Sequence, residues 1–244
     1  MLDYRVLPAG DTALMVDFGD RVDREINTAV LSLARNLEGE RIEGVVEIVP
    51  TLRALMVHYE PLAISAAALG ARIDEQMRKL KPGEIAGRLW HLPVCYDASF
   101  AIDLDDVARR TTLTPQQVVE RHAAPLYRVY MLGFLPGQAY LGEIPAQLAL
   151  QRRETPRPRV AAGSVAIAGQ MSCVFPLETP CGWHVIGRCP IPLWDAAHAS
   201  ALLAPADTVA FVPISVRQYE TLAESASRGA LRLEPASEAT GEAA

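Results

Sequence analysis

The feature that most constrains the fold of this chain is the dense spacing of glycine and proline between residues 133 and 188. Glycine adopts backbone conformations with positive φ, and proline fixes φ and removes an amide donor. Two such clusters, at 133–137 and 180–183, enclose a basic loop and a short apolar segment. This pattern predicts short strands joined by tight turns, and we expect a functional site here. The expected turn residues are Gly133, Pro136, Gly137, Gly163, Pro180 and Gly182.

Residues 1–80 predict a small α/β domain with its elements in the order ββαββα. Asp23 and Ser65 have the side chains of helix N-caps, and an apolar face with helical spacing follows each of them. The first helix is expected to run to about Leu37 and the second to about Leu80. Two helices on one face of a small sheet is the simplest packing. Strands are expected at 4–7, 13–18, 45–49 and 54–59.

Residues 81–87 (KPGEIAG) are short, polar and contain proline and glycine, so we expect a linker there. Residues 88–233 then predict closely spaced strands with few helices, which favours a β-barrel or a sandwich and an α+β class for the whole chain. Asp103 and Thr114 are expected to cap helices at 104–110 and 115–123, and a last helix is expected at 215–227. The small, polar residues 234–244 predict a disordered tail.

Composition excludes several classes of function. The formal net charge of −6 argues against nonspecific nucleic-acid binding, which requires cations that neutralise phosphate. Charged residues interrupt the first 19 positions, so no secretory signal is predicted, and the longest apolar run, 62–71, is too short to span a bilayer. The four cysteines form no Cys-x-x-Cys pair, so we expect reduced thiols in a cytoplasmic protein and no metal site.

The basic loop 152–159 (RRETPRPR) is the first candidate for chemistry. Pro156 and Pro158 favour an extended backbone, from which Arg157 and Arg159 would project on the same side. A guanidinium group binds carboxylate or phosphate through two parallel hydrogen bonds. The alternative is a solvated loop whose arginines pair with Glu154 or with another subunit.

Other candidates are weighed against structural roles. Glu178 lies between two prolines near Trp183, where it would act as an acid or base, or instead accept backbone amides or pair with Arg188. Cys181 and His184 would face opposite sides of a strand, which disfavours a thiol–imidazole nucleophile. Asp103, Asp105 and Asp106 are interpreted as capping charges of a helix. His58, His91 and His122 are interpreted as structural residues. No nucleotide-binding motif is found.

These motifs together resemble those of the KipI family, also called allophanate hydrolase subunit 1 and linked to the PxpB component of bacterial 5-oxoprolinase. The matching segments in order are YRVLPAGDTALMVDFGD, YRVYMLGFLPGQAYLGEI, RRETPRPRVAAGSVAIAG, FPLETPCGWHVIGR and DTVAFVPIS. The resemblance covers nearly the whole chain, and several motifs coincide at compatible spacing. It implies a small N-terminal α/β domain followed by a cyclophilin-like β-barrel.

The resemblance also implies a function. Family members pair with a KipA or allophanate hydrolase subunit 2-type subunit and with a LamB/YcsF-type subunit, and together they hydrolyse 5-oxoproline to glutamate with ATP. One branch inhibits a sporulation histidine kinase, and related domain pairs form the carboxyltransferase part of urea carboxylase. The ATP would be held by a partner chain. The matching positions imply catalytic roles for Glu178, Arg159 and Arg157 and substrate contacts from Arg188, Trp183, Ser164, Tyr140 and Gln170.

The chain departs from the family pattern at four positions. Gln138 stands where an aromatic residue is usual, Ala161 where proline is usual, Met171 where glutamine is usual and Cys181 where glycine is usual. Met171 and Cys181 fall in the stretch that we expect to contact ligand, so the two changes bear on the identity of the substrate.

Overall fold

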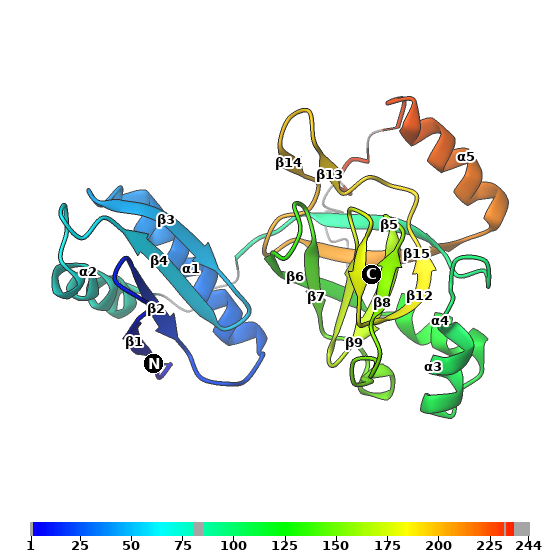
Figure 1. Ribbon diagram of the computed structural model, residues 1–244, viewed down its shortest axis with the longest axis horizontal. Coiled ribbons are helices and arrows are strands. Elements are labelled where there is room, and N and C mark those ends of the chain that lie inside the picture. Colours follow the sequence, from blue (N-terminus) through cyan, green and yellow to red (C-terminus); the bar gives the residue numbers. More distant parts are fainter. Residues whose placement is uncertain (1, 81–84, 232, 237–244) are drawn as a thin grey trace, which may run out of the picture. The chain divides into compact units, whose positions relative to one another are not determined.

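The computed structural model describes residues 2–80, 85–231 and 233–236, and the chain divides into two compact units, Met1–Ala86 and Gly87–Ala244 (Figure 1). Each unit has a hydrophobic core of its own. The first unit combines a sheet with two helices, and the second contains a closed barrel with helices around it. The α+β class predicted from the sequence is therefore confirmed.

The first unit is an antiparallel sheet of strand order β1-β2-β4-β3 covered by two helices. Leu14 and Val16 of β2 and Leu55 and Val57 of β4 alternate onto one face, where they form a core with apolar residues of both helices. The predicted ββαββα order is confirmed. The elements are β1 (Arg5–Pro8), β2 (Ala13–Asp17), α1 (Arg24–Glu40), β3 (Val45–Pro50), β4 (Ala54–Tyr59) and α2 (Ala66–Lys79).

Both predicted N-caps are present in this unit. The Asp23 carboxylate accepts the backbone amides of Glu25 at 2.7 Å and Ile26 at 3.1 Å, and the Ser65 hydroxyl accepts that of Ala68 at 3.2 Å. Helix α1 is longer than expected, because it continues from Leu37 to Glu40 and ends where Arg41 adopts a left-handed conformation, with φ of 47°.

In the second unit, seven strands close into a barrel of order β10-β7-β6-β15-β5-β12-β9 within the described residues. Strands β5 and β15 are parallel, and the other neighbouring pairs are antiparallel. The interior contains alternate side chains of each strand, among them Leu92, Val129 and Ile167. The strands are β5 (Leu89–Cys95), β6 (Leu126–Leu132), β7 (Ala139–Gly142), β9 (Ser164–Ala168), β10 (Met171–Val174), β12 (His184–Arg188) and β15 (Thr208–Ile214).

Two small sheets and several helices surround the barrel. Thr114 and Gln117 form the predicted capping box of the second helix, with Pro115 at the first helical position. The two sheets pair β8 with β11 and β13 with β14. The remaining elements are α3 (Leu104–Thr111), α4 (Pro115–Ala123), η1 (Ala146–Leu148), β8 (Arg157–Val160), β11 (Thr179–Cys181), β13 (Trp194–Asp195), β14 (Ser200–Ala201) and α5 (Val216–Ser227).

The predicted linker and the predicted tail are only partly described by the structure. Of the predicted linker 81–87, residues 81–84 lie outside the described residues, whereas Ile85 is buried and a Cβ on Gly87 would collide with the carbonyl of Ala206. In the predicted disordered tail, the amide of Ala236 donates to the Leu89 carbonyl at 2.7 Å. Ala236 thereby forms an isolated antiparallel bridge with Leu89, the first residue of β5; residue 232 and residues 237–244 lie outside the described part.

Candidate functional site

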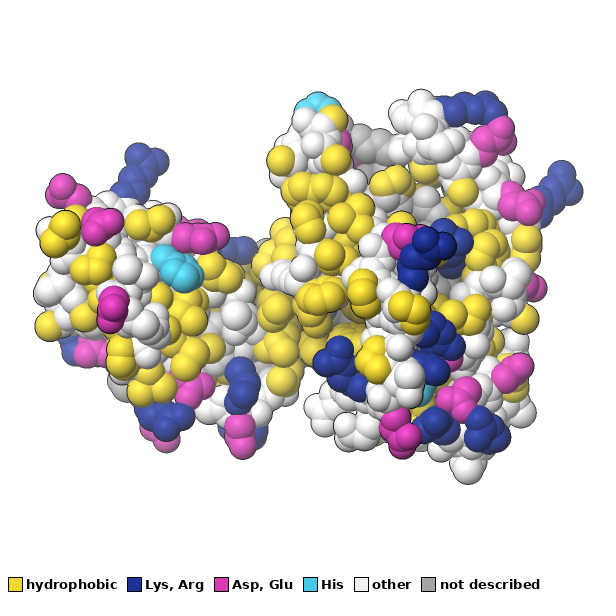
Figure 2. Space-filling model, viewed as in Figure 1, with side chains coloured by type: hydrophobic (Ala, Val, Ile, Leu, Met, Phe, Trp, Pro, Cys, Tyr) yellow, Lys and Arg dark blue, Asp and Glu magenta, His cyan; other side chains and the backbone are white. Residues whose placement is uncertain are grey.

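The stretch between residues 133 and 188 forms one wall of the barrel and a small sheet that covers it from outside. Val165 and Ile167 of β9 face the barrel interior, so Ala166 between them faces outward. Ala166, Cys173 and Val185 make a second apolar cluster with residues of the β8–β11 sheet. Figure 2 shows several basic side chains, all of them arginines in this unit, gathered over this part of the barrel.

Glycine is required at two of the predicted turns. Gly137 has a φ of 76°, and a Cβ there would lie 2.8 Å from the carbonyl oxygen of Leu193. Gly163 has a φ of 81°, and a Cβ would collide with the carbonyl oxygen of Cys189. Between Gly133 and Gly137, Phe134 also has a positive φ, of 71°, with its side chain exposed. The turns therefore press the loops closely against neighbouring backbone.

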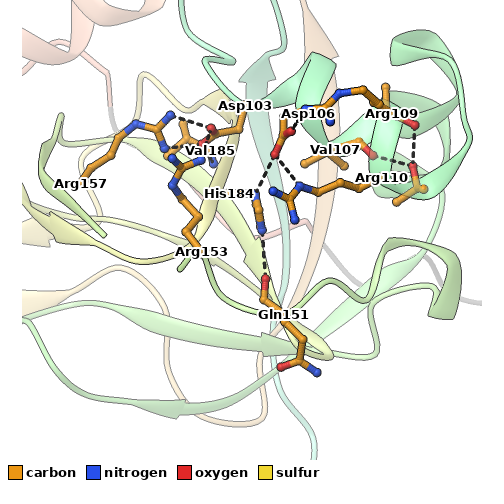
Figure 3. Close-up of polar contacts among 12 residues, drawn as sticks. Asp103, Asp106, Val107, Arg109, Arg110, Gln151, Arg153, Arg157, His184 and Val185 are labelled. Atoms are coloured by element: carbon orange, nitrogen blue, oxygen red, sulfur yellow. Dashed lines mark hydrogen bonds and ion pairs between the residues drawn. The ribbon is translucent and has the colours of Figure 1, made fainter. Parts of the chain in front are cut away.

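Asp103 is the centre of the polar network on this face (Figure 3). Its carboxylate is 3% exposed and accepts two hydrogen bonds from Arg157, each of 2.6 Å, and one from Arg153 of 2.8 Å. It also accepts the backbone amide of Val185 at 2.8 Å. Asp103 thereby joins the basic loop, the start of α3 and strand β12. Asp103 occupies the predicted N-cap position of α3, with Asp105 and Asp106 in the first turn, but its side chain makes no capping hydrogen bond and is used in this network instead.

A second network lies beside the first (Figure 3). His184 is buried, and its Nε2 lies 3.0 Å from the carbonyl oxygen of Gln151. A carbonyl only accepts, so Nε2 carries the proton, and Nδ1 lies 3.9 Å from the carboxylate of Asp106. Burial raises the pKa of Asp106, but the hydrogen bond and charge of Arg110, with smaller effects from Arg109 and His184, outweigh burial and leave this pKa lowered.

The remaining predicted charged residues lie nearer to solvent. Arg159 Nε is 3.4 Å from the Glu178 carboxylate, and these side chains are 73% and 54% exposed. Arg188 does not pair with Glu178; its Nε donates to the Ala162 carbonyl at 3.0 Å, and its guanidinium lies over the ring of Phe100. The structure thus brings Arg159 to Glu178 but directs Arg157 and Arg188 to other partners.

The predicted substrate contacts fall into separate places. The rings of Tyr140 and Trp183 meet edge to face, with centroids 5.9 Å apart. Ser164 is buried at the start of β9, where it pairs with Arg188 of β12. Gln170 is exposed in the turn after β9, and the length of that strand, about 13 Å, separates it from Ser164.

The positions that depart from the family pattern are mostly interior. Gln138, Met171 and Cys181 are all buried, and Ala161 is half-buried. The Cys181 thiol accepts the backbone amide of Trp183 at 3.2 Å, and burial, the largest effect, raises its pKa. Because His184 contacts Gln151 and Asp106 instead, the structure provides no Cys–His nucleophile at this place.

Sequence reasoning missed Asp103 and Arg153 as members of the site. Asp103 contacts residues 50, 54 and 82 positions away, so no local spacing reveals the contacts.

Among the described residues no group of His, Cys, Asp and Glu is arranged to hold a metal ion. In that same part of the chain, no helix has the length and apolar character needed to cross a membrane.

Comparison with known proteins identifies the family. Residues 4–204 match the family described as carboxyltransferase domain, subdomain C and D. The chain belongs to this family. A curated relative, a 5-oxoprolinase subunit of Bacillus subtilis (strain 168), is 34% identical over 236 residues, which cover 92% of this chain and 98% of the relative. The proteins of the same name from Haemophilus influenzae and Escherichia coli O157:H7 are 33% and 38% identical. The resemblance stated from the sequence motifs is therefore confirmed.

Solved structures of other proteins agree with the fold. The crystal structure of TTHA0988 is 34% identical with a TM-score of 0.74; it matches 83% of this chain, which spans 40% of that longer protein. The urea amidolyase of Kluyveromyces lactis has a TM-score of 0.81 at 19% identity, and the match covers 96% of this chain and 16% of that one. At this identity the second likeness shows the fold alone.

Proposed function

We propose that this protein is the PxpB-type component of a 5-oxoprolinase, an enzyme complex that opens the cyclic amide of 5-oxoproline to give L-glutamate. The observation that carries the proposal is the extent of the likeness to the 5-oxoprolinase subunit of Bacillus subtilis, since the match covers 98% of that relative. A shared domain inside a longer enzyme would match only a fraction of it, as the urea amidolyase match does. The basic face, defined here as the arginine-bearing surface formed by residues 133–188, is compatible with this function.

The chemistry explains why positive charge is needed. An amide resists attack by water, so the proposed reaction first transfers the terminal phosphoryl group of ATP to the lactam oxygen. Water then adds to the activated carbon, and the C–N bond breaks to leave an acyl phosphate. A second water hydrolyses the acyl phosphate, so that 5-oxoproline, ATP and two waters yield glutamate, ADP and phosphate. The substrate carboxylate and the phosphoryl group are both anionic. Preorganised donors that face such charge supply much of the stabilisation in comparable sites.

This chain offers guanidinium groups for that task. The stretch 133–188 contains five arginines, at positions 152, 153, 157, 159 and 188. Arg159 and Glu178 are the predicted catalytic residues whose side chains are most exposed, and we assign them to contact the phosphoryl group or its proton. Arg157 is engaged by Asp103 through both of its terminal nitrogens, so its proposed role is to hold the basic loop in place.

The proposal includes partner chains. The sequence has no nucleotide-binding loop, so the ATP is assigned to another subunit. The expected partners are a KipA or allophanate hydrolase subunit 2-type chain and a LamB/YcsF-type chain, in the cytoplasm. The exposed Arg159 and Glu178 would then complete a site that is shared with a partner chain.

Reconstitution tests the proposal. The protein is purified with both candidate partners, and ATP-dependent release of glutamate from 5-oxoproline is measured with each chain omitted in turn. We expect activity only when all chains are present, and an inactive full mixture contradicts the proposal.

The role of Arg159 is tested in the same assay. Arg159→Ala should abolish turnover while the barrel stays folded, because this side chain is largely exposed. Arg217→Ala is the matched control, since Arg217 is an exposed arginine at the start of α5. Full activity of Arg159→Ala would remove Arg159 from the site and leave the assignment of the complex intact.

A further inference from the structure

The arginines of the basic face differ in what their guanidinium groups contact. Arg153 and Arg157 donate hydrogen bonds to Asp103, and Arg188 donates one to the Ala162 carbonyl. Arg159 forms an ion pair with Glu178. Arg152 is the exception: among the described residues its guanidinium makes no hydrogen bond or ion pair. It directly precedes Arg153, whose side chain and backbone amide are both anchored, the amide to the Gly182 carbonyl at 2.8 Å. The backbone at Arg153 is therefore held in place, and the neighbouring Arg152 side chain carries a positive charge that no described residue pairs.

The guanidinium of Arg152 lies across the α-carbon of Gly182. A Cβ built on Gly182 would be 3.4 Å from its Nε and 3.5 Å from its Nη2, so a methyl group would touch it and any larger side chain would take its place. Gly182 is not among the glycines with positive φ, so its backbone conformation does not demand glycine. Glycine at position 182 instead leaves room for the guanidinium of Arg152.

Aromatic rings border the same spot. Trp183 follows Gly182 in the chain, and its ring meets that of Tyr140 edge to face. Burial is the main effect that raises the pKa of Tyr140, the Cys173 thiol raises it further, and the positive charge of Arg152 lowers it by less. Burial is also the main effect that raises the pKa of Cys181, and the charges of Arg157 and Arg152 lower it by less. The Arg152 guanidinium therefore lies against Gly182, which precedes Trp183 in the chain, and the indole of Trp183 contacts the phenol of Tyr140.

We propose that Arg152 binds the carboxylate of the substrate and that Tyr140 and Trp183 contact its ring. The inference rests on the proposed function, since 5-oxoproline is a flat five-membered lactam with one carboxylate. A guanidinium fork holds a carboxylate through two parallel hydrogen bonds, which fixes orientation as well as charge. The aromatic edges then cover the apolar carbons of the ring, and the lactam carbonyl remains available for activation. The sequence alone gives Arg157 and Arg159 as the candidates for binding a carboxylate or a phosphate.

The reconstituted complex provides the test. KM and kcat for 5-oxoproline are measured for wild type, Arg152→Gln, Arg152→Lys and the control Arg217→Gln. We expect Arg152→Gln to raise KM about 10- to 100-fold, the value of a lost charged hydrogen bond, with a smaller change in kcat. Arg152→Lys keeps the charge without the fork and should fall between, and Arg217→Gln should match wild type. Binding of 5-oxoproline and of 2-pyrrolidinone, which lacks the carboxylate, is measured by calorimetry on the same complexes.

The outcomes separate this inference from the proposed function. If wild type turns over 5-oxoproline and Arg152→Gln keeps its KM and its preference over 2-pyrrolidinone, the role of Arg152 is overturned and the function stands. If the wild-type complex shows no turnover, the function fails and this inference fails with it. A raised KM together with loss of preference for the carboxylate supports the inference. Arg152→Lys also decides if Arg152→Gln does not assemble, because a lysine with wild-type KM would rule out recognition by the fork.

Discussion

Two arginine–carboxylate pairs in the same basic loop differ in nearly every physical respect. Arg157 bonds to Asp103 through two contacts of 2.6 Å, and that carboxylate is 3% exposed. Arg159 stands only two residues further on, yet its Nε lies 3.4 Å from Glu178 and both side chains are more than half exposed. A charged pair in this loop is therefore not by itself evidence of a site. The Arg157–Asp103 pair is buried and holds the loop in place, whereas the Arg159–Glu178 pair is exposed to solvent and accessible to a ligand.

The energetics of the two pairs differ for the same reason. A buried carboxylate loses its hydration, a cost that is offset only when its oxygens have good partners. Asp103 has such partners in Arg153, Arg157 and the Val185 amide. An exposed pair keeps most of its hydration and is screened by salt, so its coupling is weak.

The largest effect is expected for Asp103→Ala. Removal of the carboxylate leaves Arg153 and Arg157, which are only about a quarter exposed, without their counter-charge. The free energy of unfolding should fall by about 3–5 kcal/mol. Tryptophan fluorescence during urea unfolding measures it, because the three tryptophans, Trp90, Trp183 and Trp194, all lie in the second unit.

Asp105→Ala is the matched control for this loss. Asp105 is an exposed aspartate of the same helix turn, and its replacement should change the free energy of unfolding by less than about 0.5 kcal/mol. Equal losses in the two variants would show that Asp103 acts through general helix charge, and the contrast between buried and presented pairs would disappear.

The next effect concerns histidine, which also occurs here buried and exposed. His122 is fully buried; Tyr96 OH lies 2.8 Å from its Nδ1 and Ser172 Oγ 3.0 Å from its Nε2, and burial lowers its pKa to about 3. Its pKa in the unfolded chain is about 6.5, so between these values only the unfolded state takes up the proton. The stability that neutral His122 confers is full above pH 6.5 and is lost as pH falls, by about 2 kcal/mol at pH 5.

Urea unfolding at pH 8 and pH 5 tests this titration. His122→Gln should be less stable than wild type at pH 8 but should lose less stability on going to pH 5. His198→Gln, which removes an exposed histidine paired with Asp195 at 2.7 Å, should keep the wild-type difference. The same pH difference in wild type and His122→Gln would mean that other groups carry the acid sensitivity.

The contrast also explains how much of this structure the sequence predicts. Local signals were sufficient for the first unit: Asp23 and Ser65 cap their helices as expected, and the apolar face of α1 that includes Val30 and Leu37 is buried. Turn chemistry was sufficient at Gly137 and Gly163, because a backbone that passes against another carbonyl excludes any larger residue. The caps act within a few residues of the chain, and the positive φ of the two glycines is also a local signal, whereas the carbonyls of Leu193 and Cys189 that they approach are distant in the sequence.

The polar centre of the candidate site could not be predicted in this way. Asp103 looks like a helix cap because it precedes Leu104-Asp105-Asp106, yet barrel closure brings it to Val185 and to two arginines of a distant loop. Arg152 and Arg153 are identical neighbours in the sequence, and only the fold makes one an anchor and leaves the other unpaired among the described residues. Such differences depend on which distant segments the fold brings together, and the spacing of residues within one segment carries no information about this.

A smaller effect is expected for Arg157→Lys. Lysine keeps the positive charge beside Asp103 but cannot form the two parallel bonds of the guanidinium. The free energy of unfolding should fall by about 1 kcal/mol, well short of Asp103→Ala. A loss as large as that of Asp103→Ala would mean that geometry, rather than counter-charge, dominates the buried pair; the same fluorescence measurement decides it.

The smallest effect on stability belongs to the exposed pair. In a double-mutant cycle of Arg159→Gln and Glu178→Gln, the coupling free energy should be below about 0.5 kcal/mol, because both side chains remain hydrated. Activity of the reconstituted complex should nevertheless fall sharply for Arg159→Gln. A coupling well above 1 kcal/mol would make this pair a structural clamp like that of Asp103 and Arg157. The loop would then present neither residue to a ligand, and within its described residues Arg152 would be the one guanidinium left to bind an anion.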